Sequence, residues 1–143
     1  MSEKIINVLY VDDEQNNLIS FKANFKKHFN IYYAVNAIEA EIILNQQLIH
    51  VLVTDQKMPI KLGTELLEES VKKYPEQTRI MLTAFAYTVE VREAFQKGHI
   101  FIILDKPWND VQLIDAIKLG YEVYNLKVER KQAQSAIDKL KGN

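Results

Sequence analysis

Short apolar runs alternate along the chain with longer stretches in which apolar residues recur at every third or fourth position. The short runs predict buried strands, and the longer stretches predict helices that turn one face towards a core. The five expected strands are residues 5–11, 31–35, 49–54, 79–83 and 100–104. The five expected helices begin near Gln15, Asn36, Thr64, Val89 and Asp110. This alternation favours an α/β protein with a doubly wound five-stranded parallel sheet, covered by helices on both faces.

Capping signals support two of these helix boundaries. Asn36 followed by Glu39 is a capping-box signature, and Asn109 followed by Gln112 is a second one ahead of the last helix. Helical spacing also predicts which side chains of the third helix face inward, namely Leu66, Leu67 and Val71.

The last predicted helix is longer than the fold needs. If it runs unbroken from Asp110 to about Lys141, it is on the order of 48 Å long, so its second half projects beyond the sheet. Spacings of four and three alternate in that half and predict a coiled-coil seam of Leu119, Val123, Leu126, Arg130, Ala133, Ile137 and Leu140. Gly120 weakens the helix where the two halves meet. We expect one globular domain over residues 4–119 and a C-terminal helical extension over residues 120–143.

Two interpretations of this extension stay open. In the first, it forms a parallel coiled-coil homodimer in which Glu122 and Lys127 occupy g and e positions and pair between chains. In the second, it is a solvated tail or a linker, because the seam is short and is interrupted by Arg130. The sequence favours neither interpretation over the other.

Composition narrows the classes of partner. Of the 143 residues 48% are hydrophobic, which is enough for the core of one domain. The formal net charge of -1 gives no sign of a nucleic-acid or anionic-membrane partner. No stretch resembles a signal peptide or a membrane span, and the absence of cysteine excludes disulfides and thiol chemistry. We therefore expect a cytoplasmic protein with protein or small-molecule partners.

Polar residues suited to chemistry follow four of the expected strands. They are Asp12, Asp13 and Glu14 after the first strand, Asp55 after the third, Thr83 at the end of the fourth and Lys106 after the fifth. In open α/β sheets, ligands bind beyond these carboxyl ends. If the first and third strands are neighbours, Asp12, Asp13 and Asp55 converge and repel one another unless a cation bridges them. Oxygen ligands without cysteine or histidine favour Mg²⁺.

The same groups favour phosphoryl transfer to Asp55. Its carboxylate would be the nucleophile, the metal and Lys106 would stabilise charge, and Thr83 would donate a hydrogen bond. Each residue alone has an ordinary explanation as well. Acids after the first strand suit a helix N-terminus, Asp55 suits a turn, and Thr83 and Lys106 suit a strand end and the surface. Their joint placement at one edge of the sheet favours the functional site.

Four motifs follow one another along the chain in the order VLYVDDE, VTDQKMPIKLG, IMLTA and LDKPW. In combination they resemble the receiver domain of response regulators in two-component signalling, over roughly residues 4–119. The resemblance implies a flavodoxin-like fold, as in chemotaxis regulators, with strand order 2-1-3-4-5. It also implies a phosphorylation-dependent signalling switch rather than an enzyme, although such a domain assists its own phosphorylation and dephosphorylation.

The resemblance implies roles for the acidic residues. Asp55 accepts a phosphoryl group from a histidine kinase or a histidine phosphotransfer protein. Asp13 and Asp55 bind Mg²⁺ together with the main-chain carbonyl of Lys57, and Asp12 acts largely through water.

The resemblance implies further roles at the fourth and fifth strands. Thr83 bonds to a phosphoryl oxygen, Lys106 forms an ion pair with the phosphoryl group, and the peptide bond before Pro107 is cis. The added charge then repacks the face formed by the fourth helix, the fifth strand and the fifth helix. The resemblance leaves open an output domain outside this sequence.

Two positions depart from the family pattern. Ile103 stands where many members carry a switch tyrosine or phenylalanine, and we expect the nearby Phe101 to lie on the same face of the strand. The usual coupling of threonine movement to an aromatic flip is therefore in question. Lys57 puts a positive side chain at the mouth of the site, and we expect it to alter the lifetime of the phosphoryl group.

Other functions on a similar fold fit less well. A phosphatase of the haloacid dehalogenase class needs an Asp-x-Asp-x-Thr pattern after the first strand, and a nucleotide or flavin binder needs glycines or hydroxyls there. The loop instead reads DDEQN. The surviving alternative is a receiver-like module that dimerises or binds a protein without being phosphorylated.

Overall fold

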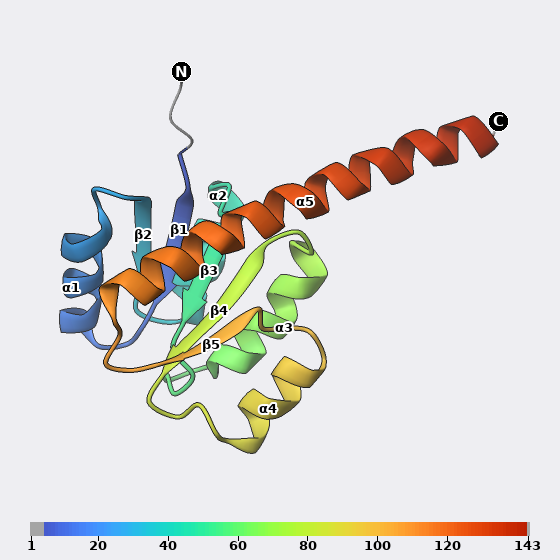
Figure 1. The fold of residues 1–143 in the computed structure, drawn as a ribbon. Helices are drawn as coiled ribbons and strands as arrows, with labels where there is room; N and C mark the ends of the chain where they lie inside the picture. The colour runs from blue at the N-terminus through green and yellow to red at the C-terminus, as the bar shows by residue number, and fades with distance from the viewer. Residues whose placement is uncertain (1–4, 143) are drawn as a thin grey trace.

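The computed structural model describes residues 5–142 and contains the expected alternation of strands and helices (Figure 1). The strands are β1 (Asn7–Val11), β2 (Asn30–Ala34), β3 (Val51–Thr54), β4 (Thr78–Thr83) and β5 (Ile102–Asp105). The helices are α1 (Gln15–Phe25), α2 (Ala37–Gln46), α3 (Gly63–Lys73), α4 (Val89–Gln96) and α5 (Asp110–Gly142). Neighbouring strands are parallel and lie in the order β2-β1-β3-β4-β5. The predicted fold class and strand order are confirmed.

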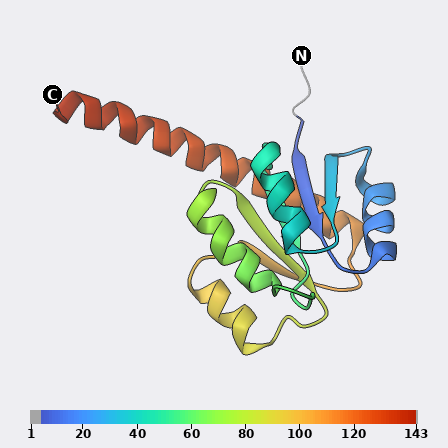
Figure 2. The same cartoon turned by 180° about the vertical axis from the view of Figure 1, so that it is seen from behind.

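Helices cover both faces of the sheet, because successive side chains of each strand point to opposite sides. Helices α1 and α5 lie on one face (Figure 1), and α2, α3 and α4 lie on the other (Figure 2). Val8 and Tyr10 of β1 belong to the core under α1 and α5, whereas Leu9 and Val11 belong to the core on the other face. The first strand is therefore buried on both sides, which explains its continuous apolar run.

Helix α3 buries a different set of residues from the predicted one. Leu66 and Leu67 are buried as expected, but Val71 is only half-buried and Ser70 takes the inward position. The prediction for Val71 is therefore met only in part, and the sequence analysis did not foresee the burial of Ser70. Ser70 can be buried there because its hydroxyl donates a hydrogen bond to Gln77 Oε1.

Both predicted helix caps are present. The Asn36 side chain accepts a hydrogen bond of 2.9 Å from the amide of Glu39, and Asn109 accepts one of 2.9 Å from the amide of Gln112. These bonds satisfy amides that have no partner within the first turn of a helix. The sequence signals therefore locate the starts of α2 and α5.

The fifth strand is shorter than predicted and begins at Ile102. Phe101 precedes it and packs with Ile102 in the core under α1 and α5, whereas Ile103 packs in the core on the opposite face. The expectation that Phe101 and Ile103 share a face was therefore wrong. Side chains alternate regularly only within a strand, and Phe101 lies outside it.

Helix α5 is continuous through Gly120, which is buried against β4. A Cβ atom at this position would lie 2.9 Å from Thr78 Cγ2, and the Thr78 hydroxyl donates a hydrogen bond of 2.5 Å to the Gly120 carbonyl. Farther along, the rings of Tyr121 and Tyr124 each lie 4.9 Å from the ring of His50. The glycine thus allows a close approach of α5 to the sheet.

Beyond these contacts α5 projects away from the sheet (Figure 1). Several residues of the predicted seam are largely exposed on it: Leu119, Leu126, Ile137 and Leu140. The helix shows no break between residues 119 and 120, and the expected ends Lys4 and Asn143 lie outside the described residues, so the domain boundaries stay a prediction. Within residues 5–142, no helix offers a stretch long and apolar enough to span a membrane.

Substitution of Gly120 by alanine tests the close approach of α5. Alanine favours a helix by about 1 kcal/mol over glycine, but overpacking a core typically costs about 1–3 kcal/mol. Because Thr78 is stiff and hydrogen-bonded, we expect Gly120→Ala to lower the free energy of unfolding by about 1 kcal/mol in urea denaturation. Adding Thr78→Ser removes the obstructing methyl group and should restore stability. A Gly120→Ala protein at least as stable as the wild type would contradict the tight contact.

Candidate functional site

The first and third strands bring three carboxylates together at one edge of the sheet. Val11 and Thr54 are paired in the β1–β3 register, and the Asp55 amide extends the pairing with a 2.9 Å hydrogen bond to the Val11 carbonyl. Carboxylate oxygens of Asp12, Asp13 and Asp55 all lie within 4.8 Å of one another. The predicted convergence of the three acids is therefore present.

Lys106 reaches this cluster from the end of β5. Its ammonium donates hydrogen bonds to Asp12 Oδ2 at 2.5 Å and to Asp55 Oδ2 at 2.9 Å. The peptide bond between Lys106 and Pro107 is cis, as the resemblance implies. The lysine therefore joins the carboxylates that follow β1 and β3.

The charges of Asp12 and Lys106 stabilise each other. Burial would raise the pKa of Asp12, but hydrogen bonds, the largest from Lys106, lower it below its usual value. Burial would likewise lower the pKa of Lys106, and the bonds to Asp12 and Asp55 raise it above its usual value. Both groups are therefore charged at neutral pH.

Asp12 is fully buried and surrounded by hydrogen-bond donors. Its oxygens accept hydrogen bonds from the Tyr10 hydroxyl, the Glu14 amide, the Asn17 side chain and Lys106. An ionised carboxylate has about four lone-pair sites, so this set nearly fills its capacity. Asp13, in contrast, is exposed.

Asp55 is held by the loop between β3 and α3. Its Oδ1 accepts a hydrogen bond of 2.7 Å from the Gln56 amide, and Gln56 Oε1 accepts one of 2.8 Å from the amide of Thr64. A Cβ atom at Gly63 would lie only 2.1 Å from the Asp55 carbonyl oxygen. Glycine at this position therefore lets α3 begin directly against the residue that carries the central carboxylate.

The donor set fits a hard divalent cation. Three carboxylates supply oxygen ligands, and one of them, Asp13, is open to solvent. Mg²⁺ prefers a small number of carboxylates together with water, and this site offers that combination. Asp13 and Asp55 are the better candidates for direct ligands, because the oxygens of Asp12 already accept several hydrogen bonds.

Thr83 and Lys57 lie beside the cluster with other partners. The buried Thr83 accepts a hydrogen bond of 3.1 Å from the Phe85 amide, and within residues 5–142 it makes no side-chain bond to Asp55. Lys57 Nζ lies 5.2 Å from the centre of the Phe85 ring, and Phe85 lines the same cleft as Asp55 and Lys106. Both residues are therefore at the predicted edge.

Tyr10, Gln56 and Gly63 were missed in the sequence analysis. One sequence signal could have predicted the contact between Tyr10 and Asp12. A tyrosine inside a buried strand needs a partner for its hydroxyl, and Asp12 follows on the same face of the strand. The roles of Gln56 and Gly63 depend on how closely the loop approaches α3, and no local pattern reveals that distance.

Known proteins are similar to this chain in sequence. Residues 8–118 match the family described as response regulator receiver domain. The chain is 29% identical to the hydrogenase transcriptional regulatory protein HoxA of Cupriavidus necator, over 127 residues that cover 89% of this chain and 26% of HoxA. It is 33% identical to the NtrX-like response regulator of Rickettsia felis, with 92% of this chain and 28% of that protein covered. It spans about a quarter of the length of these relatives.

A solved structure shows the same fold. The CheY-like response regulator receiver domain protein of Methanospirillum hungatei JF-1 superposes with a TM-score of 0.80 at 26% identity, covering 87% of this chain and 99% of that one. The strand order and the acidic edge with its lysine agree with the sequence match over residues 8–118. This chain belongs to the response regulator receiver domain family.

Proposed function

We propose that this receiver domain is a signalling switch that accepts a phosphoryl group on Asp55. The observation that carries the proposal is the position of Lys106, which bonds to both Asp12 and Asp55 at the carboxyl edge of the sheet. Asp55 is nearly buried yet lines an open cleft, so a reacting group can approach a carboxylate whose charge is already balanced.

In the proposed reaction, a carboxylate oxygen of Asp55 attacks the phosphorus of a phosphohistidine on a histidine kinase or phosphotransfer protein. A phosphorus–oxygen bond forms, the phosphorus–nitrogen bond breaks, and the departing imidazole takes up a proton. Lys106 stays beside the transferred group and stabilises its negative charge. Bound Mg²⁺, held by Asp13, Asp55 and the Lys57 carbonyl with Asp12 acting through water, would supply further positive charge. The domain turns over no separate substrate in this proposal.

The proposed switch begins at Thr83. In this structure the Thr83 hydroxyl accepts a hydrogen bond from the Phe85 amide. Phosphorylation adds a charge of about -1.5 to -2, which attracts the hydroxyl away from that amide. The β4–α4 loop moves with it, and the face formed by α4, β5 and α5 changes its packing. Ile103 lies in this region in place of an aromatic switch residue and packs in the core beside α4.

Phosphorylation of Asp55 can be measured as intact-protein mass. After incubation with Mg²⁺ and a small-molecule acyl phosphate, we expect one phosphoryl group on the wild type, none on Asp55→Asn, and none when a chelator removes Mg²⁺. The matched control is Asp105→Asn, which changes an exposed acid next to Lys106 and should leave the adduct unchanged. An adduct on Asp55→Asn, or a wild type without adduct that also fails to bind beryllofluoride, would contradict the proposal.

The Lys57–Phe85 pair offers a second test, because Phe85 lines the cleft that also contains Asp55 and Lys106. A cation–π contact at an exposed site contributes about 0.5–1 kcal/mol, and loss of this cover should ease the entry of water. We expect Phe85→Ala to shorten the half-life of the Asp55 acyl phosphate roughly three-fold. Tyr87→Ala is the control, since Tyr87 is 84% exposed in the same loop. An unchanged or longer half-life in Phe85→Ala would exclude this shielding.

The output of the switch is proposed to lie outside this chain. HoxA is named as a transcriptional regulatory protein and is about four times as long as the segment it shares with this chain. We propose that a partner or an output domain reads the phosphorylated state, and that α5, which continues well beyond the sheet, is the element that carries the signal towards it.

The exposed seam of α5 supports dimerisation as a second candidate function, either controlled by phosphorylation or independent of it. Leu126 is 63% exposed and Leu140 is 87% exposed, which is costly for a solitary helix in water. Lys131 of the same helix pairs with Glu76 at 2.9 Å, so a neighbouring face of the helix contacts the domain, while the seam positions from Leu126 to Leu140 are exposed.

Sedimentation of the wild type with and without Mg²⁺ and beryllofluoride separates these two candidates. We expect a dimer that is lost in Leu126→Asp and retained in the control Ser135→Asp, which changes an exposed residue outside the seam. If beryllofluoride increases the dimer affinity, dimerisation controlled by phosphorylation is supported. If the dimer affinity is the same in both conditions, dimerisation independent of phosphorylation is supported. A wild type that stays monomeric at high concentration in both conditions would contradict dimerisation through α5.

A further inference from the structure

Tyr10 places a hydroxyl group inside the core of the sheet. The residue is fully buried in β1, and its ring stacks on Phe21 at 4.2 Å and meets Trp108 edge-on at 6.1 Å. A phenylalanine would fill the same space, and burying a hydroxyl costs free energy unless it is hydrogen-bonded. The Tyr10 hydroxyl donates a bond of 2.6 Å to Asp12 Oδ2, so its partner is the carboxylate that also binds Lys106.

This hydroxyl is a permanent donor. The Tyr10 hydroxyl bears a single proton, and its bond of 2.6 Å directs that proton to Asp12 Oδ2. Tyr10 therefore stays bonded to Asp12, whereas the ammonium of Lys106 can exchange Asp12 for another acceptor and keep its charge. Because the Tyr10 ring packs against both Phe21 and Trp108, which also contact each other, the direction of its bond is restricted as well.

Three donors compete for one oxygen of Asp12. Oδ2 accepts from the Tyr10 hydroxyl, from the Asn17 side chain at 3.1 Å and from Lys106, whereas Oδ1 accepts from the Glu14 amide. Each neutral donor withdraws part of the charge that Asp12 can offer to the lysine. Without these donors, Asp12 would hold Lys106 more strongly and would be freer to rotate.

We propose that Tyr10 is a positioning residue for phosphoryl-group binding, which acts by fixing Asp12 and limiting its hold on Lys106. The inference rests on the proposed function of Asp55 and deepens it. In the proposed reaction Lys106 has to change acceptors, since it bonds to Asp12 and Asp55 here and to the phosphoryl group afterwards. The Tyr10 hydroxyl keeps its bond to Asp12 when the lysine turns, so Asp12 is not left without a partner and the exchange becomes easier.

The variant Tyr10→Phe tests this role because it keeps the ring and removes only the hydroxyl. Two affinities are compared: that for Mg²⁺ alone, by calorimetry, and that for beryllofluoride at saturating Mg²⁺, by fluorine NMR. We expect the beryllofluoride affinity to fall roughly five-fold, in keeping with the loss of one hydrogen bond to a charged group, while the Mg²⁺ affinity does not fall. Asn17→Ala, which removes the other neutral donor from a half-exposed position, should act in the same direction.

Two controls separate positioning from general damage. Tyr33 is the partner of Tyr10 in the β1–β2 register and is 45% exposed, so Tyr33→Phe removes a hydroxyl from the neighbouring strand and should change neither affinity. In a Lys106→Met background, Tyr10→Phe should have no further effect on beryllofluoride binding, because a residue that acts through Lys106 is silent without it.

Several results would overturn the inference. If both affinities of Tyr10→Phe stay within two-fold of the wild type, or if both fall together with the melting temperature, Tyr10 contributes packing only. An effect of equal size in the Lys106→Met background would also contradict it. If the wild type binds no beryllofluoride, both the proposed function and the role of Tyr10 are contradicted. If the wild type and Tyr10→Phe bind beryllofluoride with equal affinity, only the role of Tyr10 is contradicted.

Discussion

Three carboxylates at one edge of a parallel sheet repel one another, and the structure depends on the lysine that balances two of them. Lys106 bonds to Asp12, which follows β1, and to Asp55, which follows β3, although it comes from β5 at the edge of the sheet. Burial disfavours the charge of both Asp12 and Lys106, but the hydrogen bond between them lowers the pKa of the carboxyl group and raises that of the ammonium. The site is therefore assembled with the charges of Asp12 and Asp55 already paired to Lys106.

Much of the fold was predictable because its signals are local. The alternation of apolar runs gave the strands and helices, and the caps at Asn36 and Asn109 located two helix starts. The strand order did not follow from these patterns and came from the family resemblance. Phe101 was placed on the wrong face because the start of β5 lies two residues later than the apolar run suggests.

The candidate site was predictable to the extent that it consists of charged residues at strand ends. Asp12, Asp13, Asp55 and Lys106 come together as expected. What the sequence did not reveal are the residues that act through close approach. Gly63 lies against the Asp55 carbonyl, and Gly120 lies against Thr78, and such contacts depend on the distance between elements far apart in the chain.

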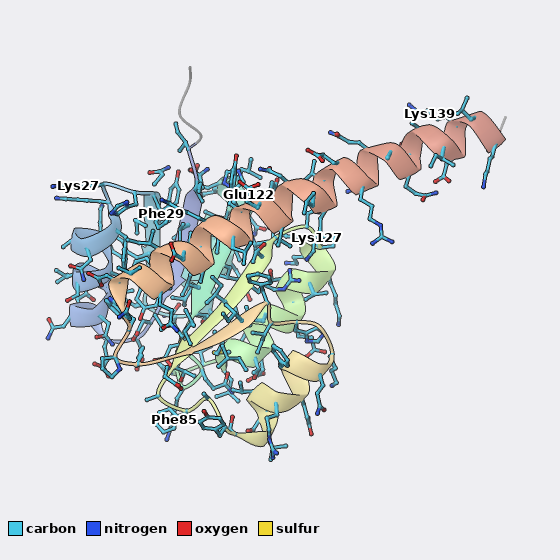
Figure 3. The ribbon with its side chains drawn as sticks, in the orientation of Figure 1. Lys27, Phe29, Phe85, Glu122, Lys127 and Lys139 are labelled. Carbon is cyan, nitrogen blue, oxygen red and sulfur yellow. The ribbon has the colours of Figure 1, made fainter. Side chains whose placement is uncertain are left out.

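The site and the free end of α5 lie at opposite ends of the molecule. Phe85, beside the cleft, and Lys139, near the end of α5, mark the two extremes in Figure 3. The helix begins shortly after Lys106, is hydrogen-bonded to β4 through the Gly120 carbonyl and then continues beyond the sheet. Lys106 thus lies close to the start of the helix that projects farthest from the domain.

The most direct measurement is a crystal structure of the protein with Mg²⁺ and beryllofluoride. The account predicts beryllofluoride on Asp55, the metal ion bound by Asp13 and Asp55, and the Lys106 ammonium within hydrogen-bonding distance of a fluorine atom. Beryllofluoride elsewhere, or Lys106 bonded to Asp12 alone as the ligand occupies Asp55, would contradict the central role assigned to this lysine.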